Sequence, residues 1–331
     1  MEFIGAGRLE VRITPLDVGK RVSIRRLVDP TGEGGRFTDT IGVLTSWDNG
    51  VLLITQRGGE SVGVPEETVV AGKVVPAAPA RRRGPATDFT ELSRVTARAW
   101  QPVESERLGE WELRAAGGFT RRANSVLPAG DPGLPLDEAL ARVGAWYAAR
   151  ELPPYVQAAT GAAGTQETLC AGLEARGWRR EVSADVRIGG LAPVADLDAE
   201  VERVALARSF DEAWLRRYQR SGVAGAHVLK VLGSGPSVWF ASVAGPGEVP
   251  AAIGRCVVDG RWAGFMAVEV DPAHRRQGLA RAVMTTLARR ALAEGASAAW
   301  LQVESDNEAA RALYQGMGFE THHSYHHFRP V

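Results

Sequence analysis

Two arginines and a glycine lie where an apolar stretch gives way to a long amphipathic one, in VEVDPAHRRQGLARAVM at residues 268–284. Arg275–Ala280 fits the pattern R-x-x-G-x-A. A turn that opens a helix points backbone N–H groups outward, and the helix N-terminus adds partial positive charge. Gly278 lets a phosphate approach the backbone, and the arginines can add charge-assisted contacts. The pattern predicts a phosphate site, and a solvated strand-to-helix turn is the alternative.

A tyrosine lies one strand and one helix further on, in NEAARALYQGMGF at residues 307–319. A thiol has a pKa of about 8.5 and a phenol of about 10, so a tyrosine can protonate a departing thiolate at a cost of roughly 2 kcal/mol. Tyr314 is therefore a candidate general acid for a reaction that expels a thiolate. Its alternative role is to pack beneath a helix with its hydroxyl at the surface.

Together the two motifs resemble those of the GNAT superfamily of N-acetyltransferases, which has R-x-x-G-x-A followed by N-x-x-A-x-x-L-Y-x-x-x-G-F. The resemblance extends over residues 185–331, and the tandem layout with its VESDN stretch also resembles mycothiol synthase. It implies a GNAT fold, α+β (α/β), with a mixed central sheet and flanking helices. It also implies acetyl-CoA as co-substrate and direct transfer of acetyl to a primary amine of a small molecule or a protein.

The resemblance implies a role for each matching residue. The backbone of the strand before the loop would pair with the pantetheine arm, and the loop amides would hold the pyrophosphate. Asn307 would hydrogen-bond the cofactor where two parallel strands separate, and Tyr314 would protonate the thiolate. The residues so assigned to acetyl-CoA are Val268, Val270, Arg275, Arg276, Gln277, Gly278, Leu279, Ala280 and Asn307.

The general base departs from the family pattern. Relatives carry a glutamate at one of two positions, which are Gly264 and Gln302 in this chain. Glu304 lies on the same strand face as Gln302 and is the candidate catalytic base. Glu269 is a second carboxylate, on the other face from Val268. Either of them could instead be a solvated surface group.

The missing glutamates favour an acceptor amine of low pKa. Deprotonating a lysine-like amine of pKa about 10.4 costs roughly 4–5 kcal/mol at neutral pH, whereas an α-amino group near 7.7–8.0 costs about 1 kcal/mol. A base reached through water is the alternative.

A run of histidines, HHSYHH, fills residues 322–327. Strand alternation places its members in two sets, His322, Ser324 and His326 on one face and His323, Tyr325 and His327 on the other. A metal site needs convergent ligands and a supporting shell, so we expect no metal here. The strand is expected to border the acceptor pocket, and one histidine could serve as base.

The third block, residues 185–331, must position these groups. Periodicity and turn signals predict the following elements. They are a helix over Leu197–Arg220, strands in VWFASVA, AAIGRCVVDG and RWAGFMAVEV, a helix over Leu279–Glu294, the strand AAWLQVE, a helix over Asn307–Gln315 and a strand in FETHHSYHHF.

The second block, residues 89–184, repeats this order more loosely and is predicted to be a degenerate GNAT-like domain. Its expected elements are helices over Leu92–Trp100, Leu136–Arg150 and Thr165–Arg176, the last ending at Gly177, and strands in TRRANSVLP and Pro154–Gln157. Asp131 and Pro132 stand where amides should face phosphate, and Leu173 stands where Tyr314 does. We therefore expect no acetyl-CoA in this block, and a role in flanking the acceptor pocket. Arg121 and Arg122 could hold an acidic acceptor or remain solvated.

The first block, residues 1–76, has five short β-like runs separated by turn signals, among them WDNG between two β-branched runs. The strand spacing resembles an SH3-like barrel. Residues 77–88 read as an extended linker rich in proline and alanine. Arg81, Arg82 and Arg83 within it could touch nucleic acid, although a solvated linker is the favoured interpretation.

Composition limits the class of partner. The formal net charge of +0 argues against a protein that mainly binds nucleic acid. Two cysteines, Cys170 and Cys256, cannot build a disulfide framework, so a reducing cytoplasm is expected. Neither a signal peptide nor a membrane span is expected. The expected partner is an amine acceptor, a small molecule or a peptide, and a homodimer remains open. Two other functions remain open as well, an acetyl-CoA sensor or scaffold without turnover and a nucleic-acid-associated modifier.

Overall fold

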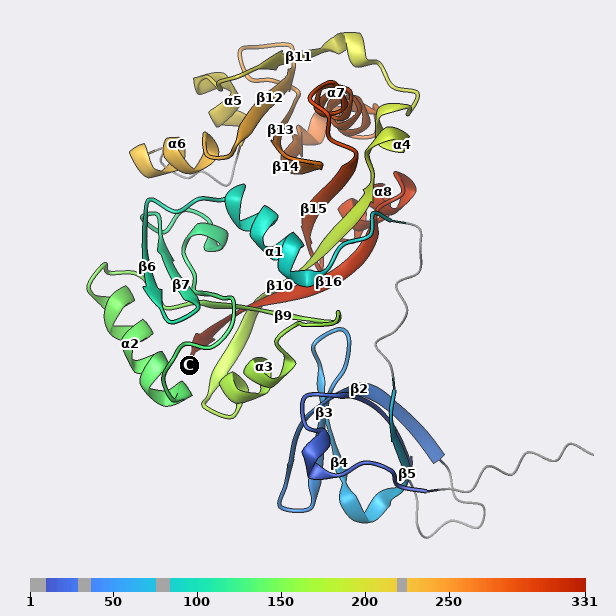
Figure 1. Cartoon of the computed structure of the whole chain (residues 1–331). Coiled ribbons are helices and arrows are strands. Elements are labelled where there is room, and N and C mark those ends of the chain that lie inside the picture. The colour runs from blue at the N-terminus through green and yellow to red at the C-terminus, as the bar shows by residue number, and fades with distance from the viewer. Residues whose placement is uncertain (1–9, 29–36, 76–83, 219–224) are drawn as a thin grey trace, which may run out of the picture. The chain divides into compact units, whose positions relative to one another are not determined.

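The computed structural model describes residues 10–28, 37–75, 84–218 and 225–331 (Figure 1). The chain divides into two compact units. One takes up residues 1–80, 158–179 and 331, and the other takes up 81–157 and 180–330. The four-part division predicted from the sequence stays a prediction. Its arginine cluster at residues 81–83 lies outside the described residues.

The first unit contains an antiparallel five-stranded sheet in the order β4-β3-β2-β1-β5. Alternate side chains such as Val22, Ile24 and Leu44 are fully buried and form its core. Asn49 and Gly50 both have positive φ, as a tight hairpin turn requires, which confirms the WDNG prediction. The five predicted strands are confirmed as β1 (Arg21–Leu27), β2 (Phe37–Asp48), β3 (Val51–Thr55), β4 (Ser61–Pro65) and β5 (Val69–Val74).

The second unit contains most of an eight-stranded sheet and a separate three-stranded sheet in the order β6-β7-β8. The large sheet has the order β11-β12-β13-β14-β15-β10-β16-β9. The strands are β6 (Glu104–Leu108), β7 (Trp111–Ala115), β8 (Leu127–Pro128), β9 (Val156–Thr160), β10 (Trp178–Gly190), β11 (Val204–Ala207), β12 (Ser237–Val243), β13 (Ala252–Asp259), β14 (Trp262–Val270), β15 (Ala298–Glu304) and β16 (Glu320–Pro330). The helices of the chain are α1 (Phe89–Arg98), α2 (Leu136–Ala148), α3 (Glu167–Glu174), α4 (Leu191–Ala195), α5 (Glu212–Arg217), α6 (Ala226–Leu232), α7 (Leu279–Ala293) and α8 (Glu308–Gly316). Of these, α3 belongs to the first unit.

The element order occurs twice, as the sequence predicts. Helix α1, strands β6–β8, α2, β9, α3 and β10 are followed by α5 and α6, strands β12–β14, α7, β15, α8 and β16. The N-terminal half runs from α1 to β10, and the C-terminal half runs from α5 to β16. The long last strand of each half pairs with a strand of the other half. β10 pairs with β15, from Ala184↔Glu304 to Gly190↔Ala298, and β16 lies between β10 and β9 (Figure 1). The two halves therefore share one sheet.

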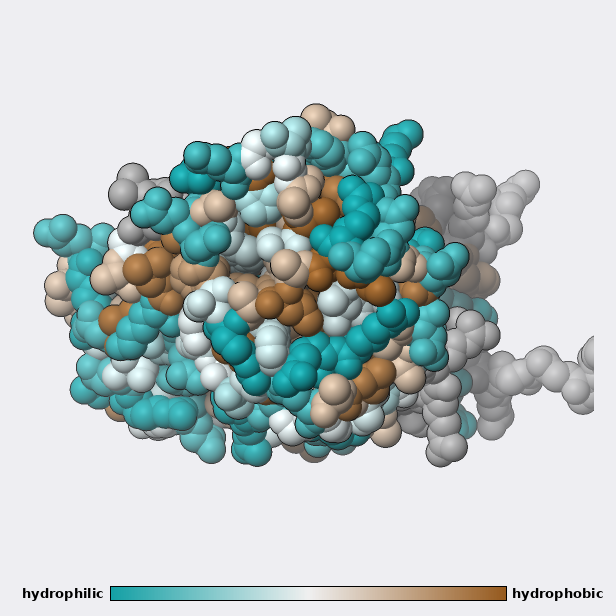
Figure 2. Space-filling model, turned by 90° about the horizontal axis from the view of Figure 1, so that it is seen from above, coloured by the Kyte–Doolittle hydropathy of each residue, from teal (hydrophilic) through white to brown (hydrophobic). Residues whose placement is uncertain are grey.

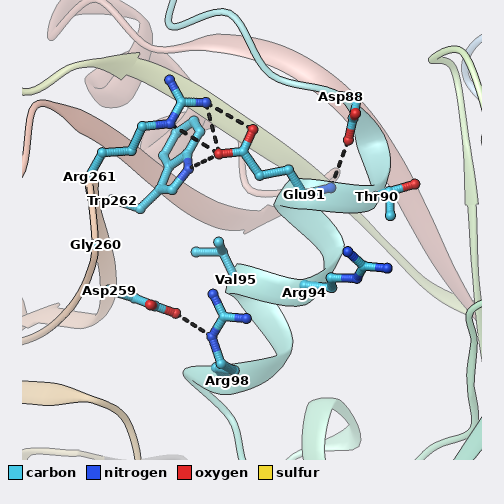
Figure 3. Close-up of a pocket in the computed structure, with 10 residues that line it drawn as sticks. All are labelled: Asp88, Thr90, Glu91, Arg94, Val95, Arg98, Asp259, Gly260, Arg261 and Trp262. Atoms are coloured by element: carbon cyan, nitrogen blue, oxygen red, sulfur yellow. Dashed lines mark hydrogen bonds and ion pairs between the residues drawn. The ribbon is translucent and has the colours of Figure 1, made fainter.

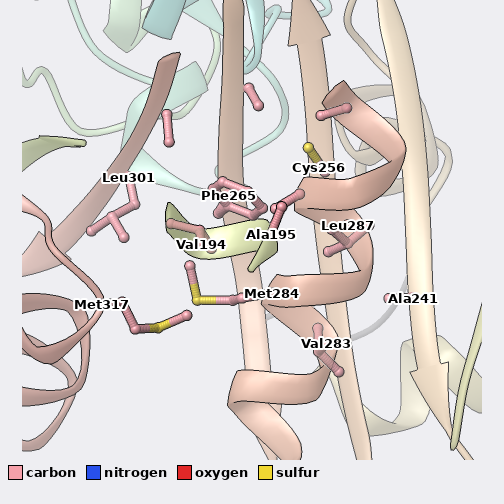
Figure 4. Close-up of a cluster of buried hydrophobic side chains, with 14 of the residues drawn as sticks. Val194, Ala195, Ala241, Cys256, Phe265, Val283, Met284, Leu287, Leu301 and Met317 are labelled. Atoms are coloured by element: carbon pink, nitrogen blue, oxygen red, sulfur yellow. The ribbon is translucent and has the colours of Figure 1, made fainter. Parts of the chain in front are cut away.

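Helix α7 covers one face of β12–β14 and closes the core of the C-terminal half (Figure 4). Its residues Val283, Met284 and Leu287 are fully buried against Phe265 and Leu301 of the sheet. The predicted apolar face of this helix is confirmed. Seen from above, apolar residues gather along the middle of the molecular surface, between polar borders (Figure 2).

Two predicted elements are wrong. The helix expected over Leu197–Arg220 is instead a 3-10 turn, the edge strand β11 and the short α5. Backbone pairing of β11 with β12 replaces the helical pattern, and Asp211 then begins α5 by accepting a hydrogen bond from the Trp214 N–H at 2.8 Å.

The strand expected in TRRANSVLP is confirmed only at β8, because Arg121–Ala123 forms a 3-10 turn. The side chain of Asn124 accepts from the Ala116 and Gly118 N–H groups and so competes with a strand ladder.

Candidate active site

Strands β14 and β15 separate halfway along their length. Their parallel pairing runs from Trp262↔Ala298 to Phe265↔Leu301, whereas β13 keeps pairing with β14 as far as Val270. Ala267, at φ 51°, marks a bulge where β14 turns away. Val268 and Val270 lie beyond this point and are half-buried. The predicted pantetheine-binding stretch of β14 therefore lies at a gap between two parallel strands.

The loop after β14 ends in an open turn at the start of α7. Arg276 has φ 62° and Gly278 has φ 76°, so their N–H groups depart from a regular helical path. The five N–H groups from Arg276 to Ala280 have no acceptor among the described residues. A Cβ placed on Gly278 would meet nothing within 4 Å. Consecutive free amides at a helix N-terminus form a site that fits a phosphate group.

The predicted loop residues come together but differ in what they offer. The side chains of Arg275, Arg276 and Gln277 are exposed. Leu279 is buried in the core, so only its amide can face a ligand. Asp271, at the start of the loop, is ion-paired with Arg217 and accepts from the Ala273 N–H at 2.8 Å, which fixes the loop's first turn.

Helix α8 carries Tyr314 and begins at Asn307. The Asn307 side-chain oxygen accepts from the Ala310 N–H at 3.1 Å and caps the helix. Its amide nitrogen has no partner among the described residues, so it can donate to a ligand. Tyr314 is half-buried, and its ring centre lies 6.1 Å from that of Phe319 in an edge-to-face contact. The tyrosine therefore packs against the core of the C-terminal half.

Charged residues of β10, which sequence analysis missed, hold α8 in place. Asp185 lies 3.4 Å from the Arg311 guanidinium, and Arg187 donates to the Arg311 carbonyl oxygen at 2.9 Å. Asp185 also accepts from the Ser324 hydroxyl at 3.0 Å. The signal in the sequence is an alternation of charged and apolar residues in ADVRIGG, because charge on the inward face of a strand needs a partner. These contacts fix the helix that carries Tyr314.

A tryptophan fills the space where relatives place a base. A Cβ on Gly264 would lie 2.3 Å from the indole ring of Trp300, which is 1% exposed. A glutamate therefore cannot occupy this position unless the ring moves. Strand alternation places Gln302 and Glu304 on the same face as Trp300. Burial raises the pKa of Tyr325, and the Glu304 carboxylate adds to that shift, so Glu304 lies near Tyr325. Glu269 is half-buried and pairs in register with Ile253.

The histidine run lies on β16 and is mostly buried. Burial lowers the pKa of His323 and of His326 to about 3, and it lowers the pKa of His327 well below its usual value. His326 Nδ1 lies 2.7 Å from the Ser183 hydroxyl, and His322 Nδ1 lies 2.9 Å from His323 Nδ1. A histidine with a pKa near 3 is a poor proton acceptor at neutral pH. Within the described ranges, we find no group of three or more histidine, cysteine or acidic residues that could hold a metal.

Arg121 and Arg122 face their own chain. Arg121 is ion-paired with Glu181, and Arg122 Nε donates to the Tyr325 hydroxyl at 2.8 Å. Both side chains are half-buried, so neither is a freely solvated surface arginine.

A cavity of about 390 Å³ lies between α1 and the turn from β13 to β14 (Figure 3). Four of its charged side chains form two ion pairs, because Arg98 lies 2.5 Å from Asp259 and Arg261 lies 2.8 Å from Glu91. The cavity lies at the opposite end of β14 from the 271–278 loop, so it is separate from the candidate site.

Two family models match the chain. One, described as "Probable histone acetyltransferase Rv0428c C-terminal", matches residues 86–328, and the other, "Rv0428c N-terminal Sm-like domain", matches residues 16–73. A probable histone acetyltransferase, Rv0428c, of Mycobacterium tuberculosis is 28% identical over 92% of this chain and 93% of its own length. None of the helices in the described part of the chain is long and apolar enough to cross a membrane.

Two further proteins are similar over different extents. The ribosomal protein bS18 alanine N-acetyltransferase of Escherichia coli K12 is 42% identical over 52 residues, which are 16% of this chain and 35% of that enzyme. A tandem GNAT protein from the clavulanic acid biosynthesis pathway shares the fold with a TM-score of 0.51 at 13% identity, over 76% of this chain and 91% of its own.

The N-terminal match is to an Sm-like model, so the SH3-like resemblance stays a prediction, as does the likeness to mycothiol synthase. The tandem arrangement is confirmed by the repeated element order and by the tandem GNAT neighbour. The C-terminal family model covers more than half of the chain and joins both halves in one match. The chain therefore belongs to the Rv0428c-like family of GNAT acetyltransferases and is an acyltransferase with an added N-terminal all-β domain.

Proposed function

We propose that this protein transfers an acetyl group from acetyl-CoA directly to a primary amine of a small molecule or a protein. One observation supports this most strongly. The five free amides of Arg276–Ala280 follow the strand that separates from β15, and Tyr314 lies on α8, the helix that follows β15. Such an arrangement suits a ligand that has a pyrophosphate at one end and a thioester at the other.

Each residue would have a distinct task. Bound acetyl-CoA supplies the activated acetyl group. The backbone of Val268 and Val270 would hold the pantetheine arm, and the loop amides with Arg275 and Arg276 would hold the pyrophosphate. Asn307 would donate from its free amide nitrogen. Tyr314 would give its proton to the departing thiolate sulfur.

Glu304 is the proposed base, acting on the amine directly or through a water. Trp300 closes the position over Gly264, and Gln302 cannot accept a proton, so Glu304 is the remaining carboxylate on that strand face. A weak base suffices for an amine of low pKa, since an α-amino group costs only about 1 kcal/mol to deprotonate at neutral pH. The bS18 alanine N-acetyltransferase acts, by its name, on a residue whose only amine is an α-amine. We therefore propose an α-amine acceptor.

The first test combines calorimetric titration of acetyl-CoA with a free-thiol assay against a panel of α-amines and lysine-like amines. We expect one acetyl-CoA per chain and thiol release with at least one α-amine. A second bound acetyl-CoA would contradict the prediction that residues 89–184 hold none. Binding without thiol release from any amine would favour the rival function, an acetyl-CoA sensor, which the closed position over Gly264 supports. Absence of binding would overturn the proposal.

Replacing Gly278 with aspartate is expected to weaken acetyl-CoA binding about 100-fold or more. The new side chain would project into open space beside the free amides and place a negative charge there, where it repels a phosphate. Calorimetry measures the Kd. Gly177→Asp is the matched control, because Gly177 has φ 77°, against 76° at Gly278, and equally open space. Equal Kd values for the two variants would show that the loop does not bind the pyrophosphate.

Replacing Glu304 with glutamine is expected to lower kcat/KM for the amine by about 100-fold, the lower end of what general bases contribute. The Kd of acetyl-CoA should not change, because Glu304 has no assigned contact with it. Glu269→Gln is the control, since it removes a half-buried carboxylate from β14. If Glu304→Gln keeps its turnover, then Glu304 is not the base.

A further inference from the structure

A small cavity lies on the face of the sheet opposite α7, close to the gap between β14 and β15. It is lined by α1 and β7 together with five residues from elsewhere in the chain, among them Trp100, Arg122 and Gln302. Two of its lining residues, Arg114 and Arg122, are arginines, and none is a carboxylate. Its volume is about 10 Å³, which admits one group of the size of a water oxygen.

Arg114 is a buried charge without a counter-ion. It is 2% exposed and donates to the Ser125 carbonyl oxygen and hydroxyl, both at 2.9 Å, and to the Gln157 side-chain oxygen at 3.0 Å. All three acceptors are neutral, and Arg114 forms no ion pair within the described residues. Burial lowers the pKa of this guanidinium. A buried charge that lacks a counter-ion is costly, so an anion placed near it would stabilise the site.

Trp100 has a buried donor with nothing to accept it. Its side chain is 4% exposed, and its indole Nε1 has no partner among the described residues. The Arg122 guanidinium lies 5.7 Å from the Trp100 ring centre, and that of Arg255 lies 5.1 Å from it. Arg255 is fully buried and donates to the Ala99 and Ser234 carbonyl oxygens, so it too has only neutral partners there. Arg122 donates a hydrogen bond from its Nε to the Tyr325 hydroxyl, whereas its two terminal nitrogens have no partner in the described part of the chain.

The cavity adjoins the place where the acetyl group would be delivered. Gln302, which lines it, follows Leu301, the last residue of β15 that pairs with β14. Glu304 lies two residues further along on the same strand face. A ligand group held in the cavity would thus keep its remainder near both the gap and the proposed base.

We propose that this cavity binds a carboxylate of the acceptor, and that the acceptor is a small amine bearing a carboxylate, such as a dipeptide, whose α-amine keeps the low pKa of a peptide terminus. One carboxylate oxygen would enter and accept hydrogen bonds from Trp100 Nε1 and the terminal nitrogens of Arg122, while Arg114 and Arg255 add positive potential. The inference rests on the proposed acetyl transfer, because it names the substrate class of the same site.

The kinetic test compares matched pairs of amines on the full chain, alanylalanine with its C-terminal amide and glycylglycine with its C-terminal amide. The two members of a pair differ in the carboxylate and also in the pKa of the amine. The quantity to measure is therefore kcat/KM for the acid divided by kcat/KM for the amide, and this ratio is compared between each variant and the unmodified protein. Arg122→Gln should reduce the acid-to-amide ratio about tenfold or more relative to the unmodified protein, and Arg122→Lys should reduce it less. Arg94→Gln is the control, because Arg94 is an exposed arginine on α1 outside this cavity. An unchanged ratio in Arg122→Gln overturns the proposal.

A binding test keeps the inference separate from turnover. Propionate should raise the Tm of the unmodified protein more than propionamide does, and this difference should vanish in Arg122→Gln and shrink in Trp100→Phe. If acetyl transfer fails with every amine and the propionate effect holds, the carboxylate site stands and the acetyl-transfer proposal falls. If propionate and propionamide raise the Tm equally and the protein does acetylate amines, the proposed carboxylate site is wrong and the proposed acetyl transfer is supported.

Discussion

Replacing Tyr314 with phenylalanine is expected to lower kcat by about 10² to 10⁴-fold, the usual contribution of a positioned general acid. The Kd of acetyl-CoA should stay the same, because the ring packs on the core beside Phe319 through its carbon skeleton and phenylalanine keeps that contact. The free-thiol assay gives kcat, and calorimetry gives the Kd.

Tyr155→Phe is a suitable control for the loss of a phenolic hydroxyl. The Tyr155 hydroxyl lies 3.1 Å from the Glu181 carboxylate and has no part in the proposed reaction. If Tyr314→Phe and Tyr155→Phe both turn over at the unmodified rate, Tyr314 is only a packing residue and the proton must reach the thiolate from elsewhere.

Lowering the pH from 7 to 5 is expected to reduce the free energy of unfolding by about 4 kcal/mol through His323 and His326 alone. Both have pKa values of about 3 in the fold, against about 6.5 when unfolded. The unfolded chain therefore binds more protons between pH 6.5 and 3, so stability is present above pH 6.5 and is lost as the pH falls through that window. The lowered pKa of His327 acts in the same direction. Total stabilities of 5–15 kcal/mol are usual for domains, so the loss should be severe.

Urea unfolding at pH 7, 6 and 5, followed by tryptophan fluorescence, measures this dependence. In His323→Leu, the slope between pH 6 and 5 should fall by about 1 kcal/mol per pH unit, since one titrating group is gone. His323 packs edge-on against Phe89, and leucine can keep an apolar contact there. Acidic residues titrate alike in both proteins, so the difference between the two slopes isolates the histidine. A slope that the substitution does not change would mean that His323 is protonated in the fold as readily as in the unfolded chain.

The parts of the fold with strong local signals could be predicted from the sequence. The β15 strand and the α7 and α8 helices agree with their predicted ranges to within a residue or so, because their apolar periodicity and caps lie within one segment. The helix predicted over Leu197–Arg220 was wrong because pairing with a distant strand determines the structure of this segment. Val204–Ala207 becomes an edge strand only because β12 offers a free edge for it to pair with.

The candidate site likewise has parts that the sequence predicts and parts that it does not. The loop at Arg275–Ala280 and the Asn307–Tyr314 stretch are each continuous in sequence, and each follows one of the two strands that separate. Their roles in binding a cofactor stay predictions. By contrast, Trp300 over Gly264 depends on register between two strands, and Trp100 between Arg122 and Arg255 depends on three segments far apart in the chain. Spacing alone carries no information about such contacts.

The exchange of β10 and β16 limits how the gene for this protein could be divided. A polypeptide of residues 185–331 would carry Tyr314 and the loop before α7, and it would keep the part of β10 that pairs with β15 from Asp185 onward. It would lose the first part of β10 and all of β9, and these two strands flank β16. Unpaired strand edges of that length invite aggregation. Residues 89–184 thus supply the strands that flank β16. Because each half covers a strand edge of the other, neither half can be removed without leaving that edge unpaired.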